Sequence, residues 1–311
     1  MLDVRRMRVL REVAARGSFS AAAESLSFTQ SAVSQHVAAL EREAGVTLVE
    51  RGARGIRLTE AGEAIVRHAD AVLSRLESAE EELRAIAGLR GGRLRLAGFQ
   101  SAGATLLPRA VREFHELHPD VELGMLQAEP TAATALLRSG EIDLAVVYDV
   151  EAIPGMLDDD LELVHLIDDP YRLLLPEGHP LAGRKRLRLA DLAEESWVKS
   201  TDASGCRRIT FRACEEAGYE PRVAFEADDI ATGQALVAAG VGAALFPQLA
   251  LTTLHPGVVA RSLGSDAPVR RIHAARLPGA YRSPASEAMV QILLDVAEVF
   301  SEQDPPLAAV S

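Results

Sequence analysis

Three segments at the start of the chain carry apolar residues at helical spacing. The first runs from Val4 to Ala15 and stops at Gly17, and the second is a short segment opened by Ser18 or Ser20. The third covers 29–41, and its apolar residues form one inward-facing stripe: Val33, Val37 and Leu40. We therefore expect three helices, of which the last two are joined by a tight turn.

The outer face of the third segment is small and polar, and carries Gln30, Ser31, Ser34 and Gln35. Such a face suits the major groove of DNA, since bulky or acidic residues would clash with bases or phosphates. Residues 46–59 then alternate in short β-like stretches around a basic, glycine-containing turn with Arg51 and Arg54, which suits a wing over the DNA backbone. The sequence predicts a mainly α winged helix-turn-helix domain over residues 1–59.

A sustained heptad pattern follows this domain. Its apolar positions alternate at spacings of four and three residues: Ile65, Ala69, Val72, Leu76, Ala79, Leu83 and Ile86. At about 1.5 Å per residue the seam would run roughly 40 Å, too long for a small domain to cover, so we expect a helix that pairs with a second copy of the chain. The alternative is an amphipathic helix lying on its own C-terminal domain. Glycines near residue 90 end the helix, which gives a linker and hinge over 60–91.

Strand and helix patterns alternate from residue 92 onward. The first cycle predicts a parallel sheet with strands near 93–99, 121–126 and 143–148 and helices near 106–117 and 131–139. A second cycle has strands near 171–175, 197–199 and 241–246 and a helix near 206–217, and a strand at 269–275 and a helix at 284–300 return to the first lobe. We predict a two-lobed α/β domain over 92–302, with a ligand cleft between the lobes, and a disordered tail over 303–311.

Charge is distributed unevenly along the 311 residues. The formal net charge is −12, yet residues 1–59 carry nine Arg against six acidic residues, so the basic surface is local. No apolar run reaches the roughly 20 residues that a membrane span needs, and no signal segment opens the chain, so we expect a cytoplasmic protein without membrane contact. Two cysteines allow neither a disulfide framework nor a cysteine-rich zinc site.

Several groups of residues together resemble one protein family, the LysR-type transcriptional regulators, over essentially the whole chain. They are Gly17–Ala23, Gln30–Gln35, Leu40–Glu41, Gly45 and Arg57–Gly62, and further along Leu106–Pro108, Gly140–Ala145 and Gly240–Pro247. The N-terminal group is specific in order and spacing, whereas the later ones are mostly structural. One departure is Val49, where the family more often has Phe.

The resemblance implies a regulator that binds double-stranded DNA and a small-molecule effector. It implies a homodimer joined by the long helix, a homotetramer through the effector domains, contact with RNA polymerase if the protein is an activator, and a C-terminal domain similar to type 2 periplasmic binding proteins. By position, Gln30, Ser31, Ser34 and Gln35 would face the groove, and Arg51 and Arg54 would contact phosphates or the minor groove. His36 either touches phosphate or is solvated.

The family's cleft contacts fall on two loops, here Gln100, Ser101 and Ala102, and Ser200 and Thr201. The side chains of Thr131, Tyr148 and Phe246 are assigned either to the same cleft or to the core. Hydroxyl groups near helix starts favour an anionic effector, although a serine at a helix start can also be only a cap.

Other functions remain open at this point. Cys206 and Cys214 lie where peroxide-sensing members of the family keep a redox pair, but one residue closer together than in that pattern, so they are redox thiols or packing residues. The pair Asp168 and Asp169 suggests either a cation site or a solvated loop. A solute-binding protein or small α/β enzyme is the rival from another class, although no enzyme motif is present. We expect no enzymatic activity, no cofactor and no metal.

Overall fold

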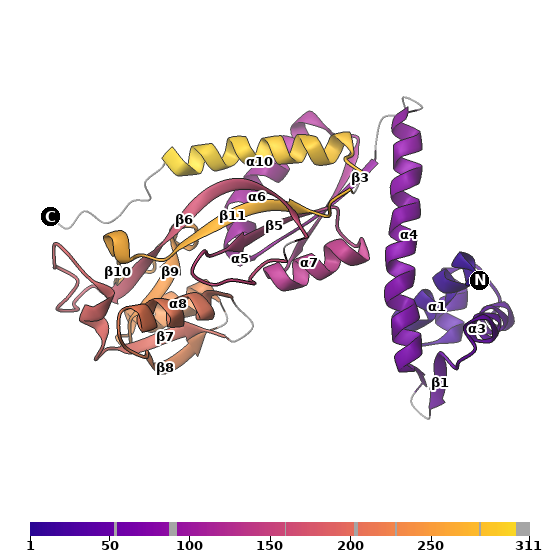
Figure 1. The fold of residues 1–311 in the computed structure, drawn as a ribbon, viewed down its shortest axis with the longest axis horizontal. Coiled ribbons are helices and arrows are strands. Elements are labelled where there is room, and N and C mark those ends of the chain that lie inside the picture. The colour runs from indigo at the N-terminus through magenta and orange to yellow at the C-terminus, as the bar shows by residue number, and fades with distance from the viewer. Residues whose placement is uncertain are drawn as a thin grey trace. The chain divides into compact units, whose positions relative to one another are not determined.

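The computed structural model in Figure 1 describes residues 1–52, 55–86, 92–158, 160–201, 205–227, 229–279 and 281–302. Two units can be separated in it, one of residues up to 90 together with 136–142 and one of the remaining residues. In the described ranges, no helix is both long enough and apolar enough to traverse a lipid bilayer.

Three helices form the N-terminal core: α1 (Val4–Arg16), α2 (Phe19–Ser25) and α3 (Gln30–Ala44). Their inward-facing residues make one apolar cluster, which includes Met7, Leu10, Val13, Ala22, Val33, Val37 and Leu40. The stripe expected on the third helix is therefore buried, which confirms its predicted orientation.

Each of these helices begins at a side chain that accepts hydrogen bonds from the first turn. Asp3 caps α1, Ser18 caps α2 and Thr29 caps α3. Gly17 and Gly45 end α1 and α3 with φ of 63° and 72°, in the left-handed region that glycine adopts without steric cost. Ser18, one of the two residues expected to cap the second helix, is the cap that the structure shows.

A hairpin of β1 (Val49–Gly52) and β2 (Gly55–Leu58) leads into the long helix α4 (Glu60–Ile86). Glu41 of α3 fixes the approach to this hairpin, because its Oε1 accepts the backbone N–H groups of Leu48 at 2.8 Å and Val49 at 3.3 Å. The Thr59 hydroxyl accepts the Gly62 N–H at 3.0 Å and so caps the first turn of α4. The end of the linker, 87–91, lies outside the described residues.

The first lobe of the C-terminal domain is built on β3 (Gly92–Gly98), β4 (Val121–Gln127) and β5 (Leu144–Asp149), which pair in parallel in the order β4-β3-β5. The late strand β11 (Val269–Arg276) adds antiparallel to β5 and confirms the predicted return to this lobe. The helices α5 (Gln100–Ala104), α6 (Leu106–Leu117) and α7 (Pro130–Ser139) connect these strands, and α10 (Pro284–Glu302) packs on α6 (Figure 1).

One strand, β6 (Glu162–Pro176), belongs to both lobes. Its first part pairs with β11, and its last part pairs with β9 (Ala244–Pro247) and β10 (Val258–Arg261) in the second lobe. The sequence predicted only 171–175 as strand, because the charged run before Pro170 reads as loop when neighbours along the chain alone are considered. That expectation was wrong, and β6 runs three times as far, over 15 residues.

The second lobe adds β7 (Ser196–Ser200) and β8 (Arg222–Ala227), which pair in parallel, and the helices α8 (Gly205–Glu216) and α9 (Ile230–Ala238). Three short 3-10 turns complete it: η1 (Leu189–Leu192), η2 (Gln248–Leu251) and η3 (Gly264–Asp266). Successive side chains of β6 point to opposite faces of the sheet. Leu174 packs on the side of α9, whereas Leu173 and Leu175 belong to the main core. The strands β8 and β10 and the helix α9 were not predicted from the sequence.

Candidate functional site

The outer face of α3 is polar and accessible. Gln30, Ser31 and Gln35 are exposed and Ser34 is half-buried, on the side opposite the buried stripe. His36 is half-buried, and its ring stacks on that of Phe28 with centroids 5.8 Å apart. Phe28 is itself 48% exposed in the turn before α3, so His36 and Phe28 form an accessible stacked pair of rings beside the polar face.

The wing is described only in part. Arg51 lies in β1, but its side chain is outside the described part of the structure, as is the whole of Arg54. Arg57 on β2 is exposed and pairs across the hairpin with Glu50, so it is a basic side chain on the wing that the sequence analysis did not select. Val49 is half-buried and packs on the N-terminal cluster, in the place where the family more often has Phe.

The heptad seam of α4 divides into two parts. Ala69 is fully buried and Ile65 packs on the N-terminal cluster, so both serve the protein's own domain. Further along, apolar side chains stand in solvent, with Val72 37%, Leu76 49% and Leu83 66% exposed. Ala79 is exposed as well, and Ile86 ends the helix with a side chain outside the described part.

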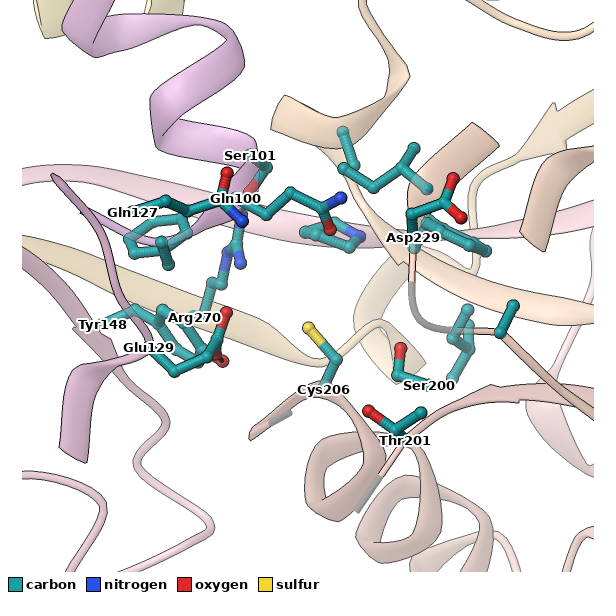
Figure 2. A pocket seen from close by; sticks show the side chains of 17 residues that line it. Gln100, Ser101, Gln127, Glu129, Tyr148, Ser200, Thr201, Cys206, Asp229 and Arg270 are labelled. Carbon is teal, nitrogen blue, oxygen red and sulfur yellow. Dashed lines mark hydrogen bonds between the residues drawn. The ribbon is translucent and has the colours of Figure 1, made fainter. Parts of the chain in front are cut away.

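A cavity of about 290 Å³ lies between the two lobes of the C-terminal domain. Figure 2 shows its walls, which come mostly from the carboxyl ends of strands in both lobes: residues at or just after the ends of β3, β4 and β5 on one side, and at the ends of β7, β8 and β9 on the other. Parallel strands bring such ends to one edge, and this edge is where α/β domains bind ligands.

Six of the eight predicted cleft residues line this cavity: Gln100, Ser101, Tyr148, Ser200, Thr201 and Phe246. Ala102 and Thr131 do not line it. Ala102 is fully buried on α5, one residue beyond the lining, and Thr131 is exposed near the start of α7. Ala102 lies on a helix, where successive side chains point about 100° apart. A residue next to a lining residue in the sequence can therefore point away from the cleft.

A buried ion pair lies at one end of the cavity. Arg270 and Asp169 are 1% and 2% exposed, and the guanidinium donates to Asp169 through Nε at 2.9 Å. Nη2 of Arg270 also donates to Ser101 Oγ at 2.6 Å, and the guanidinium lies over the rings of Phe99 and Tyr148 at 4.6 Å and 4.9 Å. The Ser101 hydroxyl expected to receive an effector is therefore already bound by a side chain of the protein.

Burial and charge act on this pair in opposite directions. Burial raises the pKa of the Asp169 carboxyl, against the effect of Arg270 and of the Leu249 N–H, which donates to it at 3.0 Å. Burial alone would lower the pKa of Arg270, but Asp169 together with Tyr171, Cys206 and Tyr148 outweighs it, so the pKa is raised. We regard both groups as charged, because each has a direct partner of opposite charge. The solvated-loop interpretation of 168–169 was wrong for Asp169, whereas Asp168 is exposed and contacts His165.

Glu129 is the second ionisable group of the first lobe in the cavity wall. It follows β4, and its Oε2 accepts the Tyr148 hydroxyl at 2.9 Å. The backbone N–H of Gly205, at the start of α8 in the second lobe, also donates to this carboxylate. Burial raises the pKa of Glu129 despite these two hydrogen bonds and the nearby charge of Arg270.

Both cysteines lie on α8, in the first and third turns. The Tyr171 hydroxyl donates to Cys206 Sγ at 3.2 Å, and Cys206 lines the cavity. Cys214 is buried, contacts the Tyr219 hydroxyl at 3.5 Å, and has its pKa raised by burial. Eight residues of helix separate the two cysteines by about 12 Å, beyond the reach of a disulfide unless the helix opens.

Sequence reasoning missed Arg270, Asp169, Gln127, Glu129, Cys206 and Asp229 as lining or supporting residues of the cavity. Gln127 and Glu129 could have been found, because they follow a predicted parallel strand as Gln100 does. Arg270 and Asp169 could not, since they are 101 residues apart and only the pairing of β6 with β11 brings them together. Within the described ranges, no three His, Cys, Asp or Glu side chains are grouped to hold a metal ion.

Comparison with known proteins identifies both units. The family model "LysR substrate binding domain" matches residues 87–298, and "Bacterial regulatory helix-turn-helix protein, lysR family" matches residues 4–63. The Probable HTH-type transcriptional regulator LrrA of Synechococcus elongatus is 33% identical over 298 residues, which cover 95% of this chain and 98% of LrrA.

Solved structures show the same fold. Full-length OxyR from Pseudomonas aeruginosa matches with a TM-score of 0.74 at 24% identity, over 98% of this chain and 97% of that one. Full-length CbnR complexed with its target DNA matches with a TM-score of 0.69 at 23% identity, over 95% of this chain and all of that one. The predicted two-lobed effector domain behind a helix-turn-helix domain is confirmed, and the chain belongs to the LysR-type transcriptional regulators.

Proposed function

We propose that this regulator binds a specific double-stranded DNA sequence with α3 and releases or rearranges it in response to a small molecule in the interlobe cavity. The observation that carries the first part is the α3 surface, where Gln30, Ser31 and Gln35 are exposed and no acidic residue stands among them. Glutamine can pair bidentately with adenine, while serine accepts several bases. Arg51, Arg54 and Arg57 add phosphate contacts from the wing, which fix the register without reading sequence.

The working units are a DNA-binding domain over 1–59, a linker over 60–91 and an effector domain over 92–302. Two copies join along α4 through Val72, Leu76, Ala79 and Leu83, because exposed apolar residues at heptad spacing are stabilised by a partner helix. Ile65 and Ala69 take no part in this pairing, since they attach the helix to its own DNA-binding domain. The effector domains join dimers into a tetramer, and an activating form contacts RNA polymerase.

The ligand acts by binding one arrangement of the subunits better than another. The cavity reaches both lobes, so a ligand that contacts Gln100 on one side and Ser200 or Thr201 on the other stabilises a closed cleft. A population shift of this kind requires differential affinity for the two arrangements. The family to which the chain belongs consists typically of regulators and not of enzymes, which agrees with a cavity used for binding.

Salt-dependent DNA binding tests the proposal. Genome-wide mapping of bound DNA supplies the duplex, and fluorescence anisotropy then measures affinity for it and for a scrambled duplex at increasing salt. We expect a steep loss of affinity with salt, with a slope of about −0.9 per phosphate contact, and a preference for the mapped sequence. Gln35→Ala should reduce that preference, whereas the control Glu220→Gln, in the effector domain, should not. Equal affinity for both duplexes would contradict the proposal.

Thiol sensing is the second candidate, favoured by one observation: Cys206 lines the ligand cavity and is half-buried. The position of both cysteines on α8 argues against a direct disulfide. Peroxide treatment followed by mass spectrometry and DNA binding tests the idea, with Cys206→Ser as the variant and Cys214→Ser as the control. A DNA response to peroxide that Cys206→Ser abolishes would establish sensing, and an unchanged response would exclude Cys206.

A further inference from the structure

The ionisable groups around the cavity do not favour a simple anion. Among the described lining residues Arg270 is the one cation, and it is already paired with Asp169 directly behind it. Glu129 and Asp229 also line the cavity, and neither forms an ion pair with a basic side chain among the described residues. The described lining therefore has an excess of negative charge, which opposes a ligand whose net charge is negative.

Glu129 is held in place more firmly than a surface glutamate. It takes one hydrogen bond from Tyr148 and one from the Gly205 backbone, and Tyr148 in turn lies against Gly205, where a Cβ would come within 2.6 Å of the tyrosine oxygen. A carboxylate has about four lone-pair directions, so two remain for a ligand. Figure 2 shows Glu129 beside Tyr148 and Arg270, on the side of the cavity opposite Asp229.

The two acidic residues differ in accessibility. Asp229 is exposed, caps α9 through the Thr232 N–H at 2.8 Å, and has its pKa lowered by hydrogen bonds to Thr232. It is therefore ionised at neutral pH and acts from the mouth of the cavity. Glu129 is half-buried. The effective dielectric constant beside it is lower than in water, so its carboxylate attracts a positively charged ligand group more strongly there.

We propose that the effector carries a protonated amine, which Glu129 binds directly and Asp229 attracts from the cavity mouth. The amides of Gln100 and Gln127 and the hydroxyls of Ser200 and Thr201 then hold the remaining polar groups, and Phe246 and Ile230 cover its apolar part. A cavity of about 290 Å³ suits a compact molecule such as an amino acid or a small amine. This inference rests on the proposed function, in that it names the class of ligand for the same cavity.

A protonated Glu129 would give the opposite pH dependence of ligand binding. If Glu129 were protonated, its hydroxyl would donate to a ligand carboxylate, and binding would weaken as pH rises and the proton leaves. With an ammonium ligand, binding strengthens as pH rises through the pKa of Glu129, because the carboxylate form is the one that binds. The sign of the pH dependence therefore separates the two.

Matched pairs of small molecules test the inference on the full-length protein. The probes are 2-amino acids and the 2-hydroxy acids of the same skeleton, measured by isothermal titration calorimetry between pH 5 and 8. We expect the amino member of the binding pair to bind at least tenfold more tightly, with no loss of affinity as the pH rises. Glu129→Gln should bring the ratio close to one, while Glu220→Gln, an exposed carboxylate outside the cavity, should leave it unchanged.

Hydroxy acids that bind as tightly as their amino partners, or a ratio that Glu129→Gln does not alter, would overturn the inference. Thermal unfolding of each variant shows whether it is folded. DNA binding is measured in parallel with whichever probe binds. If a hydroxy acid binds and alters DNA binding, the inferred amine ligand is wrong but the proposed function stands. A probe that binds and leaves every DNA footprint unchanged contradicts the proposed function.

Discussion

Arg270 and Asp169 form an ion pair that is almost inaccessible to water, with Nε and Oδ2 2.9 Å apart and the two residues on neighbouring strands, β11 and β6. Asp169 also accepts the N–H of Leu249 in the second lobe, and Arg270 donates to Ser101 in the first. The pair therefore links both lobes at the point where they meet the cavity.

Removal of one partner should be costly. Asp169→Asn leaves a buried guanidinium without a counter-charge, and we expect a loss of about 3–5 kcal/mol in the free energy of unfolding, measured by urea denaturation. The double variant Asp169→Leu with Arg270→Met should recover much of that loss, because it buries no charge. The control Asp168→Asn, which removes an exposed carboxylate, should cost less than about 1 kcal/mol. Equal losses for Asp168→Asn and Asp169→Asn would refute the structural role of the pair.

The exposed seam of α4 should govern the oligomeric state. Leu76→Glu with Leu83→Glu places charges on both sides of a self-paired ridge, so we expect size-exclusion chromatography with light scattering to show smaller assemblies and DNA affinity to fall with them. Arg75→Glu, on the neighbouring face of the same helix, is the control. If the double variant keeps the assembly of the unmodified protein, the seam is not the interface.

Gly62 should tolerate no side chain. A Cβ on this residue would lie 2.1 Å from the Leu48 carbonyl oxygen, where the start of α4 meets the hairpin. We expect Gly62→Ala to destabilise the DNA-binding domain by about 2–3 kcal/mol, since the backbone must shift to relieve the overlap. Hydrogen exchange of that domain measures the loss. Gly103→Ala, where the added Cβ meets nothing within 4 Å, should leave exchange unchanged.

His273 should make the effector domain sensitive to mild acid. The residue is 8% exposed, with Nε2 3.3 Å from Asp149 Oδ1 and no hydrogen-bond partner for Nδ1 in the described part of the structure. Burial lowers the pKa of His273 despite Asp149, with His165 and Arg271 also acting against its charged form.

A lowered pKa in the folded state means that the unfolded chain takes up the proton first. Stability is therefore full above the unfolded histidine pKa of about 6.5 and falls as the pH drops below it. His273→Gln should show a smaller loss of thermal stability between pH 7.5 and 5.5 than the unmodified protein, and the exposed control His115→Gln should behave like the unmodified protein. An identical pH profile for His273→Gln would contradict the prediction.

Local pattern predicted much of the fold, because helix and strand periodicity is written into adjacent residues. The buried stripe of α3 and the parallel direction of β3, β4 and β5 follow from such patterns. The start of β6 does not, since its charged residues are stabilised by partners far along the chain, as Asp169 is by Arg270. For the same reason the sequence predicted the cleft loops at Gln100 and Ser200 but not the charged residues that line the cavity with them.

The path of β6 sets a limit on how the cleft moves. Residues of this strand pair with β11 in the first lobe and with β9 and β10 in the second, without an interruption between the two sets. The two lobes cannot move independently of each other, because any change in the angle between them bends this hydrogen-bonded strand. Any closure of the cleft must therefore bend β6 where its partners change, between Pro170, which pairs with β11, and Tyr171, which pairs with β9.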